Sequence, residues 1–292
     1  MQTEALVGWF APSERLEQAS FSTMSFFRPP QPTSPPPQTN QYGAVAAVYD
    51  RLMDNVPHAL WLSRIEKAVR LRGKSPVSAL DCACGTGLVT ELLFERGYRP
   101  VVGFDLSAAM IDIARTKAQA SVHAGRLDTP QFEVQNAAHL DLGDRTFDLV
   151  VSMFDSLNYI LEPSDLQSAF HRLFTHTSAN GTLAFDMNAL YALSHDLFTQ
   201  EQRFGPVQHD WKAHWDRETR LCRVEMDFWV KDEQTGETRT FHETHIQRAY
   251  TVPEVTEWLQ NAGYRNIEVF GNYGERAPGA KSDRLLFIAD KP

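Results

Sequence analysis

Ala79-Leu80-Asp81-Cys82-Ala83-Cys84-Gly85-Thr86-Gly87 is the stretch that decides the fold of this chain. It begins as an apolar strand, reaches a carboxylate and enters a tight loop of small residues, after which a helix is expected to begin near Leu88. Because glycine has no Cβ, such a loop lets the backbone approach a bound molecule closely. The next apolar run ends in Asp105, and a carboxylate at the tip of that strand suits the paired hydroxyls of a ribose. The pattern predicts a site for an adenosine-bearing cofactor.

The charges around the loop distinguish between the possible cofactors. A P-loop would place a lysine after the last glycine, but none follows Gly87 until Lys117. A dinucleotide fingerprint would have a third glycine where this chain has Thr90. A pyrophosphate would also be repelled by Asp81, whereas S-adenosylmethionine (SAM) has no phosphate and carries a sulfonium and an ammonium. Asp81 and Asp105 therefore favour SAM over NAD.

The same residues resemble motif I of the class I SAM-dependent methyltransferases, and residues 102–110 resemble the second strand and following helix of that family. The resemblance implies that the loop holds the methionine part of the cofactor and that Asp105 binds the ribose. It also implies that Leu106 and Met110 pack against the adenine. On this basis the expected cofactor-binding residues are Asp81, Ala83, Cys84, Gly85, Gly87, Asp105, Leu106, Met110, Asn136, Ala137 and Met153.

Two later segments extend the resemblance. Residues 132–137 resemble the third-strand segment that holds the adenine amino group; the family often has Asp where this chain has Asn136, whose amide oxygen can still accept a hydrogen bond. Residues 147–159 resemble the fourth strand and the catalytic lip after it, where ligands of open α/β sheets bind. The expected substrate-binding residues are Asp155, Asn158, Tyr159 and Arg248.

The whole chain limits the class of function. Its 292 residues suit one large α/β domain or a domain plus a small subdomain, and its net charge of -9 argues against duplex nucleic acid as the substrate. Only three cysteines occur and two lie in the motif, so a reducing, cytoplasmic location is expected and a disulfide framework is not. No apolar run approaches the length of a membrane span. We expect a small-molecule methyl acceptor, with neither nucleic acid nor membrane as a partner.

Composition and the family resemblance together predict how the chain is organised. Residues 1–41 are expected to form a disordered Pro-rich tail, and the resemblance implies that residues 42–292 form a SAM-dependent methyltransferase domain. Alternating strands and helices predict a Rossmann-like seven-stranded, mostly parallel sheet with helices on both faces, and the resemblance implies that the closing strand is antiparallel. The expected strands lie near 77–82, 101–105, 131–135, 147–153, 181–187, 266–270 and 284–289, and the expected helices near 88–96, 107–120, 163–176 and 251–263.

A change of period after Asn188 predicts an insertion. Apolar and polar residues alternate there, and turns near residues 217 and 235 predict a three-stranded antiparallel meander over residues 206–250. The chain resembles a bacterial subgroup similar in layout to the glycine/sarcosine and deoxyaminosugar N-methyltransferases. That resemblance implies that the insertion covers the active site.

The candidate catalytic residues are Tyr49 and His245. Methyl transfer is an in-line displacement that needs a positioned nucleophile and no metal. His242 and His245 fall on opposite faces of a strand and cannot chelate zinc together. The side chains of Glu243, His245 and Gln247 share one face, which either lines a substrate cleft or is simply the solvated face of the meander. Tyr49 either lies over the cofactor, as the resemblance implies, or is an ordinary buried helix residue.

Two classes of function remain open on the sequence. The first is a SAM-dependent methyltransferase acting on N or O of a small molecule. The second is an NAD(P)-linked oxidoreductase or a non-catalytic SAM-binding protein. Thr90 and the lack of an arginine near the end of the second strand speak against NADP, and a binding protein would need neither the lip nor the covering insertion.

Overall fold

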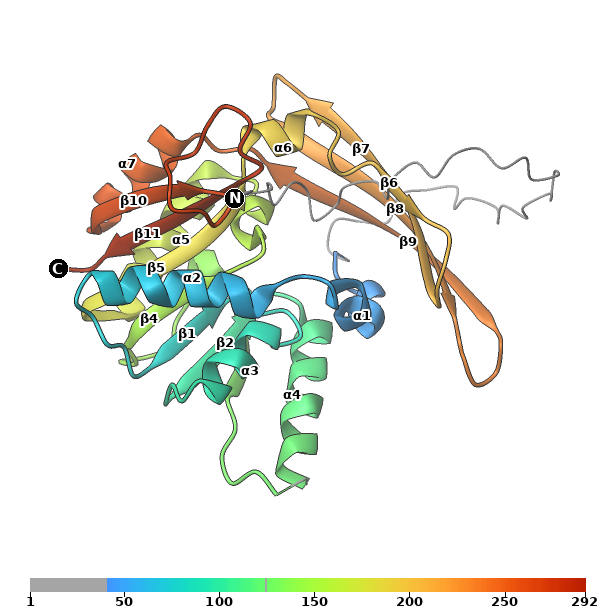
Figure 1. Cartoon of the computed structure of the whole chain (residues 1–292), viewed down its shortest axis with the longest axis horizontal. Coiled ribbons are helices and arrows are strands. Elements are labelled where there is room, and N and C mark those ends of the chain that lie inside the picture. The colour runs from blue at the N-terminus through green and yellow to red at the C-terminus, as the bar shows by residue number, and fades with distance from the viewer. Residues whose placement is uncertain (1–40, 124) are drawn as a thin grey trace, which may run out of the picture.

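The computed structural model describes residues 41–123 and 125–292, so the expected tail, except Gln41, lies outside the described residues. A seven-stranded sheet with the order β10-β11-β5-β4-β1-β2-β3 forms the body of the molecule (Figure 1). Five neighbouring strands are parallel, and β11 runs antiparallel to β5 and β10, as predicted. Its strands are β1 Ala79–Cys82, β2 Val101–Asp105, β3 Gln131–Val134, β4 Phe147–Ser152, β5 Thr177–Asn188, β10 Arg265–Gly271 and β11 Arg284–Asp290.

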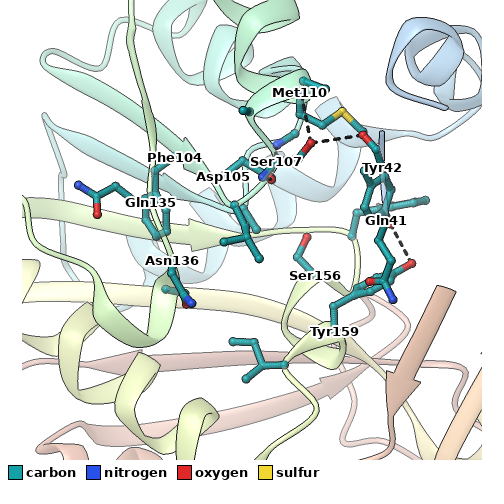
Figure 2. A pocket seen from close by; sticks show the side chains of 18 of the residues that line it. Gln41, Tyr42, Phe104, Asp105, Ser107, Met110, Gln135, Asn136, Ser156 and Tyr159 are labelled. Carbon is teal, nitrogen blue, oxygen red and sulfur yellow. Dashed lines mark hydrogen bonds between the residues drawn. The ribbon is translucent and has the colours of Figure 1, made fainter. Parts of the chain in front are cut away.

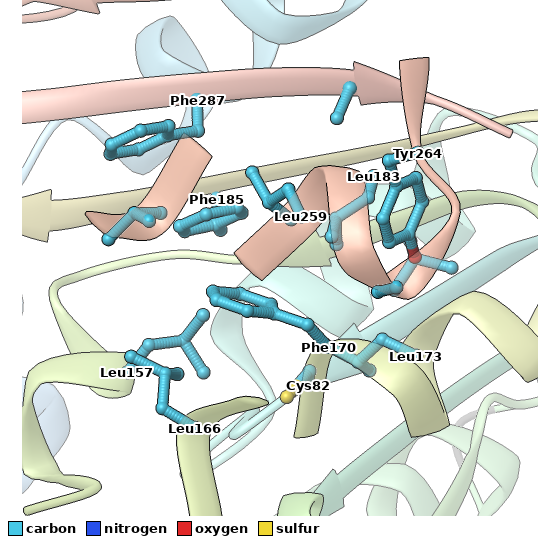
Figure 3. Close-up of a cluster of buried hydrophobic side chains, with 14 of the residues drawn as sticks. Cys82, Leu157, Leu166, Phe170, Leu173, Leu183, Phe185, Leu259, Tyr264 and Phe287 are labelled. Carbon is cyan, nitrogen blue, oxygen red and sulfur yellow. The ribbon is translucent and has the colours of Figure 1, made fainter. Parts of the chain in front are cut away.

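Helices cover both faces of the sheet. One apolar cluster joins the sheet to α2 (His58–Leu71) and α3 (Leu88–Glu95), and another joins it to α5 (Pro163–His176) and α7 (Val252–Ala262). In the second cluster, Figure 3 shows Phe170, Phe185 and Phe287 packed in a row, with ring centroids 5.4 and 4.9 Å apart. Burial of such side chains is the main favourable term in folding.

Local signals in the sequence set the helix ends as expected. The Ser107 hydroxyl accepts a hydrogen bond from the backbone of Met110 at the start of α4 (Ala108–His123). Thr251 and Glu254 form a capping box at the start of α7, near where the helix was expected to begin. Before α2, a short 3₁₀ turn, Val45–Val48, continues into α1, Tyr49–Met53.

The insertion forms a second, antiparallel sheet of four strands, one more than predicted. The additional strand, β6 (Gln200–Gln202), is too short to show alternation and pairs with the edge of β7. A short helix, α6 (Leu190–Ser194), leads into the sheet from β5. The other strands of the inserted sheet are β7 Val207–Asp216, β8 Leu221–Lys231 and β9 Thr238–Arg248. Figure 1 shows this inserted sheet (β6–β9) projecting beside the main sheet, with α1 near its inner face.

Two further observations concern the cysteines and the helices of the described residues. Cys82, Cys84 and Cys222 are all buried free thiols. Over residues 41–123 and 125–292, no helix combines the length and apolar character needed to cross a membrane.

Candidate active site

A cavity of about 450 Å³ lies at the carboxyl ends of the parallel strands (Figure 2). Its walls are formed by the glycine loop after β1, the tip of β2, the start of α4, the segment after β3 and residues 41–49, which we call the N-terminal segment. We call it the cofactor cavity. The predicted site residues that line it are Tyr49, Ala83, Gly85, Asp105, Leu106, Met110, Asn136, Ala137 and Tyr159.

The loop that follows β1 depends on its glycines. Gly85 and Gly87 have φ values of 55° and 83°, a region that residues with a Cβ rarely adopt. A Cβ on Gly87 would come within 2.8 Å of the Phe132 ring, so this glycine allows the loop to pack against β3 and α4. A Cβ on Gly85 would meet only the Tyr49 ring, at 3.9 Å, because this residue faces the cofactor cavity.

Asp105 joins the loop to the second strand. Its Oδ2 accepts a hydrogen bond from the Gly85 backbone at 2.9 Å, and its Oδ1 accepts one from the Ser107 backbone at 2.8 Å. Burial raises the pKa of this carboxyl, and those backbone hydrogen bonds oppose the shift. Each oxygen retains a lone pair, so the fixed carboxylate suits two adjacent hydroxyl donors in the cavity.

Asp81 supports the loop from behind and does not line the cavity. It is 1 % exposed, and its Oδ2 accepts a hydrogen bond from the Thr90 hydroxyl at 2.6 Å. Thr90 holds the position where a dinucleotide site has its third glycine. Burial raises the pKa of Asp81 to about 7. Cys84, Gly87 and Met153 also lie outside the lining, so their expected part in cofactor binding is at most structural support.

The expected adenine side of the cavity is apolar. Leu106 is 70 % exposed at its edge and Met110 is buried in its wall. The amide oxygen of Asn136 accepts a hydrogen bond from the Ala138 backbone at 2.9 Å. That oxygen keeps a second lone pair for an amino donor, and the amide nitrogen is available to a ring nitrogen acceptor.

A second cavity, of about 50 Å³, adjoins the first on the side of the inserted sheet. We call it the acceptor cavity. Four aromatic residues, Tyr42, Tyr49, Phe154 and Tyr159, line both cavities and so form the wall between them. The remaining lining residues are Val45, Leu52, Met53, Asp155, Phe198, Trp211, Cys222, Val224, Met226, Phe228, His245 and Gln247.

A chain of hydrogen bonds runs from this shared wall into the inserted sheet. The Tyr42 hydroxyl donates to the Tyr159 hydroxyl at 2.8 Å, and the Tyr159 hydroxyl lies 3.1 Å from Nδ1 of His245. Nε2 of His245 lies 2.9 Å from Oε2 of Glu243. Glu243, His245 and Gln247 are buried, so this face of β9 lines a cavity and is not the solvated face of the sheet. Burial raises the pKa of Tyr159 and keeps its hydroxyl protonated.

The N-terminal segment is fastened over both cavities. The Glu243 carboxylate accepts hydrogen bonds from the backbones of Tyr42 and Val45, at 3.0 and 2.9 Å. On the other side, Asp50 of α1 accepts a hydrogen bond from the Thr86 hydroxyl and pairs with Lys117 at 2.8 Å. Tyr49 is thereby held between the cavities, and its hydroxyl makes no hydrogen bond to any residue that the structure describes.

Asp155 lines the acceptor cavity and is held in place by a buried network of hydrogen bonds and ion pairs. Its two oxygens accept hydrogen bonds from Arg284 at 2.8 Å and from Gln247 at 2.7 Å. Arg284 also pairs with Asp186 at 3.1 Å and lies over the rings of Trp61 and Phe154. Burial raises the pKa of Asp155, and the Arg284 charge opposes the shift.

Two expected substrate-binding residues line neither cavity. Asn158 is fully buried, and its amide donates to the carbonyls of Arg248 and Asn188 and accepts from the Asn188 backbone. It therefore joins the lip to β5 and β9, and we assign Asn158 and Arg248 no contact with substrate. His242 faces the other side of β9 from His245 and bonds to Asp227 and Glu225, so the two histidines are separated as expected.

Sequence reasoning missed several residues of the site. Tyr42 follows the Pro-rich stretch and belongs to no periodic pattern, so no local signal marks it. Arg284 lies in a closing strand whose pattern shows only that it is buried, and its partners come from the lip after β4 and from β5. Glu243 and Gln247 were not missed, because they alternate with His245 along β9 and were placed on the same face as His245.

The residues of the cofactor cavity fit SAM. The loop, the Asp105 carboxylate and the apolar edge suit an adenosine with a charged tail, and no lysine or arginine is present among the described lining residues to pair with a pyrophosphate.

The comparisons with known proteins agree with this fit. Residues 79–181 match the family model described as a methyltransferase domain. A protein of Geobacillus sp. (strain WCH70) assigned to the methyltransferases is 31% identical over 255 residues, which cover 86% of this chain and 99% of that protein. The dTDP-3-amino-3,6-dideoxy-alpha-D-glucopyranose N,N-dimethyltransferase of Streptomyces fradiae is 26% identical over 86% of this chain and 92% of its own.

Among solved structures, a SAM-dependent methyltransferase from Clostridium acetobutylicum ATCC 824 superimposes with a TM-score of 0.74 at 25% identity, covering 85% of this chain and 98% of that one. Its layout agrees with the seven-stranded sheet found here. The expected use of SAM in place of NAD is confirmed by these relatives, and the chain belongs to the class I SAM-dependent methyltransferases.

Proposed function

We propose that this enzyme methylates an amine nitrogen of a small molecule held in the acceptor cavity. One observation carries the proposal: Tyr159 lies in the wall between the two cavities and connects to the buried His245–Glu243 pair. A group placed at this wall would face the cofactor cavity on one side and a proton acceptor on the other.

The charges near the acceptor cavity favour an amine over an alcohol. Three buried carboxylates, Asp155, Asp186 and Glu243, lie in or behind its wall, and Arg284 is the cation that pairs with the first two. The surroundings are therefore negative overall when His245 is neutral. Because such a field stabilises a cation, an ammonium would be drawn to this cavity. The N,N-dimethyltransferase named above lends independent support.

The residues of the chain would then act in a defined order. SAM supplies a methyl group on a sulfonium when it is bound. Nδ1 of His245 takes a proton from the bound ammonium through the Tyr159 hydroxyl, which accepts one proton as it donates its own. Glu243 accepts the hydrogen bond from Nε2 and stabilises the imidazolium that forms. The freed nitrogen lone pair forms the new N–C bond while the sulfur keeps the electrons of the bond that breaks.

The aromatic wall has a second task, which is to hold the nucleophile in line and exclude water. Tyr42 packs 4.6 Å from the His245 ring and 5.8 Å from the Tyr49 ring, measured between centroids. Burial raises the pKa of Tyr49, so its hydroxyl stays neutral and can hold the acceptor by a hydrogen bond without competing as a nucleophile.

The test uses the full chain with methyl-labelled SAM and pairs of acceptors that differ in one group. Benzylamine is compared with benzyl alcohol, and glucosamine with glucose. Label is expected in an amine product and in neither hydroxyl compound. Transfer to the hydroxyl compounds with none to the amines would overturn the proposal.

A further inference from the structure

The acceptor cavity has a chemistry of its own, set by the inserted sheet. Alternate residues of β8 point into it, and all of them are apolar: Cys222, Val224, Met226 and Phe228. Trp211 of β7 and Phe198 continue this surface, and Leu52 and Met53 of α1 close it from the opposite side. Beyond the polar wall of Tyr159, Asp155, His245 and Gln247, an occupant would therefore meet hydrocarbon and aromatic rings.

Anionic groups would find no partner there. The described lining residues include neither lysine nor arginine. Arg284, below the cavity, is committed to Asp155 and Asp186 and covered by two aromatic rings. A phosphate in this cavity would lose its hydration without gaining a cation, and it would face the negative field described above.

The size of the cavity agrees with its chemistry. At about 50 Å³ it is far below the roughly 300–1,000 Å³ of pockets that enclose drug-sized ligands. The cofactor cavity, in contrast, falls within that range. The part of an acceptor that this cavity holds is therefore small, and a sugar carrying a nucleotide is far too large for it.

We propose that the natural acceptor is a small, unphosphorylated amine whose substituent is apolar or aromatic. This inference rests on the proposed N-methylation and narrows its substrate class. It separates this chain from the Streptomyces relative, whose name specifies a dTDP-linked amino sugar. The polar wall takes the amine, and the apolar face of β8 takes the substituent.

Binding is measured by calorimetry on the full chain saturated with S-adenosylhomocysteine. The probes are benzylamine, 2-phenylethylamine, glucosamine and a dTDP-linked amino sugar. The two aromatic amines are expected to bind at least about tenfold more tightly than either sugar, because only they bury apolar surface. Tighter binding of the nucleotide-linked sugar, or no binding of the aromatic amines, would overturn the inference.

A pair of variants locates the effect. Met226→Gln keeps the length of a side chain in the acceptor cavity but makes it polar, and Ile246→Gln makes a similar change on the opposite face of the sheet. Met226→Gln should raise the dissociation constant of benzylamine roughly tenfold and Ile246→Gln should leave it unchanged. Unaltered S-adenosylhomocysteine affinity in both shows that they are folded. Equal effects of the two substitutions would contradict the assignment of this face.

The outcomes separate this inference from the proposed function. If labelled methyl reaches glucosamine or the nucleotide-linked sugar and not benzylamine, N-methylation stands and the apolar substrate class is wrong. If label reaches only hydroxyl compounds, the proposed function fails and this inference fails with it.

Discussion

Replacing Asp105 with alanine should weaken cofactor binding far more than it weakens the fold. Asp105 lines the cofactor cavity, and its two carboxylate oxygens accept hydrogen bonds from the Gly85 and Ser107 backbones, at 2.9 and 2.8 Å. Each oxygen can accept one further hydrogen bond from a ribose hydroxyl. A hydrogen bond to a charged group contributes about 1.5–3 kcal/mol, and water that enters the variant site recovers part of the loss of two.

We therefore expect Asp105→Ala to cost about 3 kcal/mol of binding free energy, which is roughly a 150-fold increase in the dissociation constant of S-adenosylhomocysteine. Isothermal titration calorimetry measures it directly. Asp148→Ala is the matched control, because Asp148 also accepts hydrogen bonds from two backbone groups, Val77 and Ser78, but lies away from both cavities. An affinity of Asp105→Ala within about twofold of wild type would refute the ribose assignment.

Three more predictions concern the cofactor and the buried charges. S-Adenosylhomocysteine should raise the melting temperature, by the equivalent of roughly 2.7 kcal/mol at 100 times its dissociation constant, and NAD should not; the reverse would contradict the fit of the cavity. Arg284→Met should lower the free energy of unfolding in urea by roughly 3–5 kcal/mol, because it leaves Asp155 and Asp186 without their cation. The control Arg64→Met removes an exposed ion pair with Glu275 and should lower it by at most about 1 kcal/mol. The pKa of Asp81 is raised to about 7, so the folded protein holds a proton that the unfolded chain has already released. The free energy of unfolding of wild type, relative to Asp81→Asn, should therefore fall as the pH rises from about 4 to about 7, and a flat difference would contradict the shift.

The sequence was sufficient for the features that depend on local pattern. The loop of residues 79–87 needs its glycines because Gly87 has a positive φ and packs against Phe132, and this requirement is visible in the chain. The capping box at Thr251 and the carboxylate at the tip of β2 are likewise local. For the same reason the parallel core of the sheet followed from the alternation of strands and helices, whereas the strand order appears only in the structure.

The features that the sequence left open, or that the structure places differently, depend on how distant segments meet. Asn158 was expected to face substrate because it follows β4, but the register of β5 and β9 places their backbones around its amide. The sequence could not show whether the face of β9 that carries His245 is solvated or lines a cavity. The answer depends on what packs against this face, and in the structure Tyr42 packs against it. The strand β6 is three residues long and leaves no pattern. None of these contacts is encoded in spacing along the chain.

The proposed mechanism depends on proton transfer from the acceptor through Tyr159 to His245. The most direct test of this relay is a double-mutant comparison of methyl transfer to benzylamine at saturating SAM. Tyr159→Phe and His245→Gln should each lower kcat by roughly 10²–10⁴-fold with S-adenosylhomocysteine affinity unchanged, and the double variant should be no slower than the slower single one, because the two side chains act as one unit. His242→Gln, on the opposite face of the same strand, should keep the wild-type rate. Wild-type rates in both single variants, or losses that multiply in the double variant, would contradict the relay.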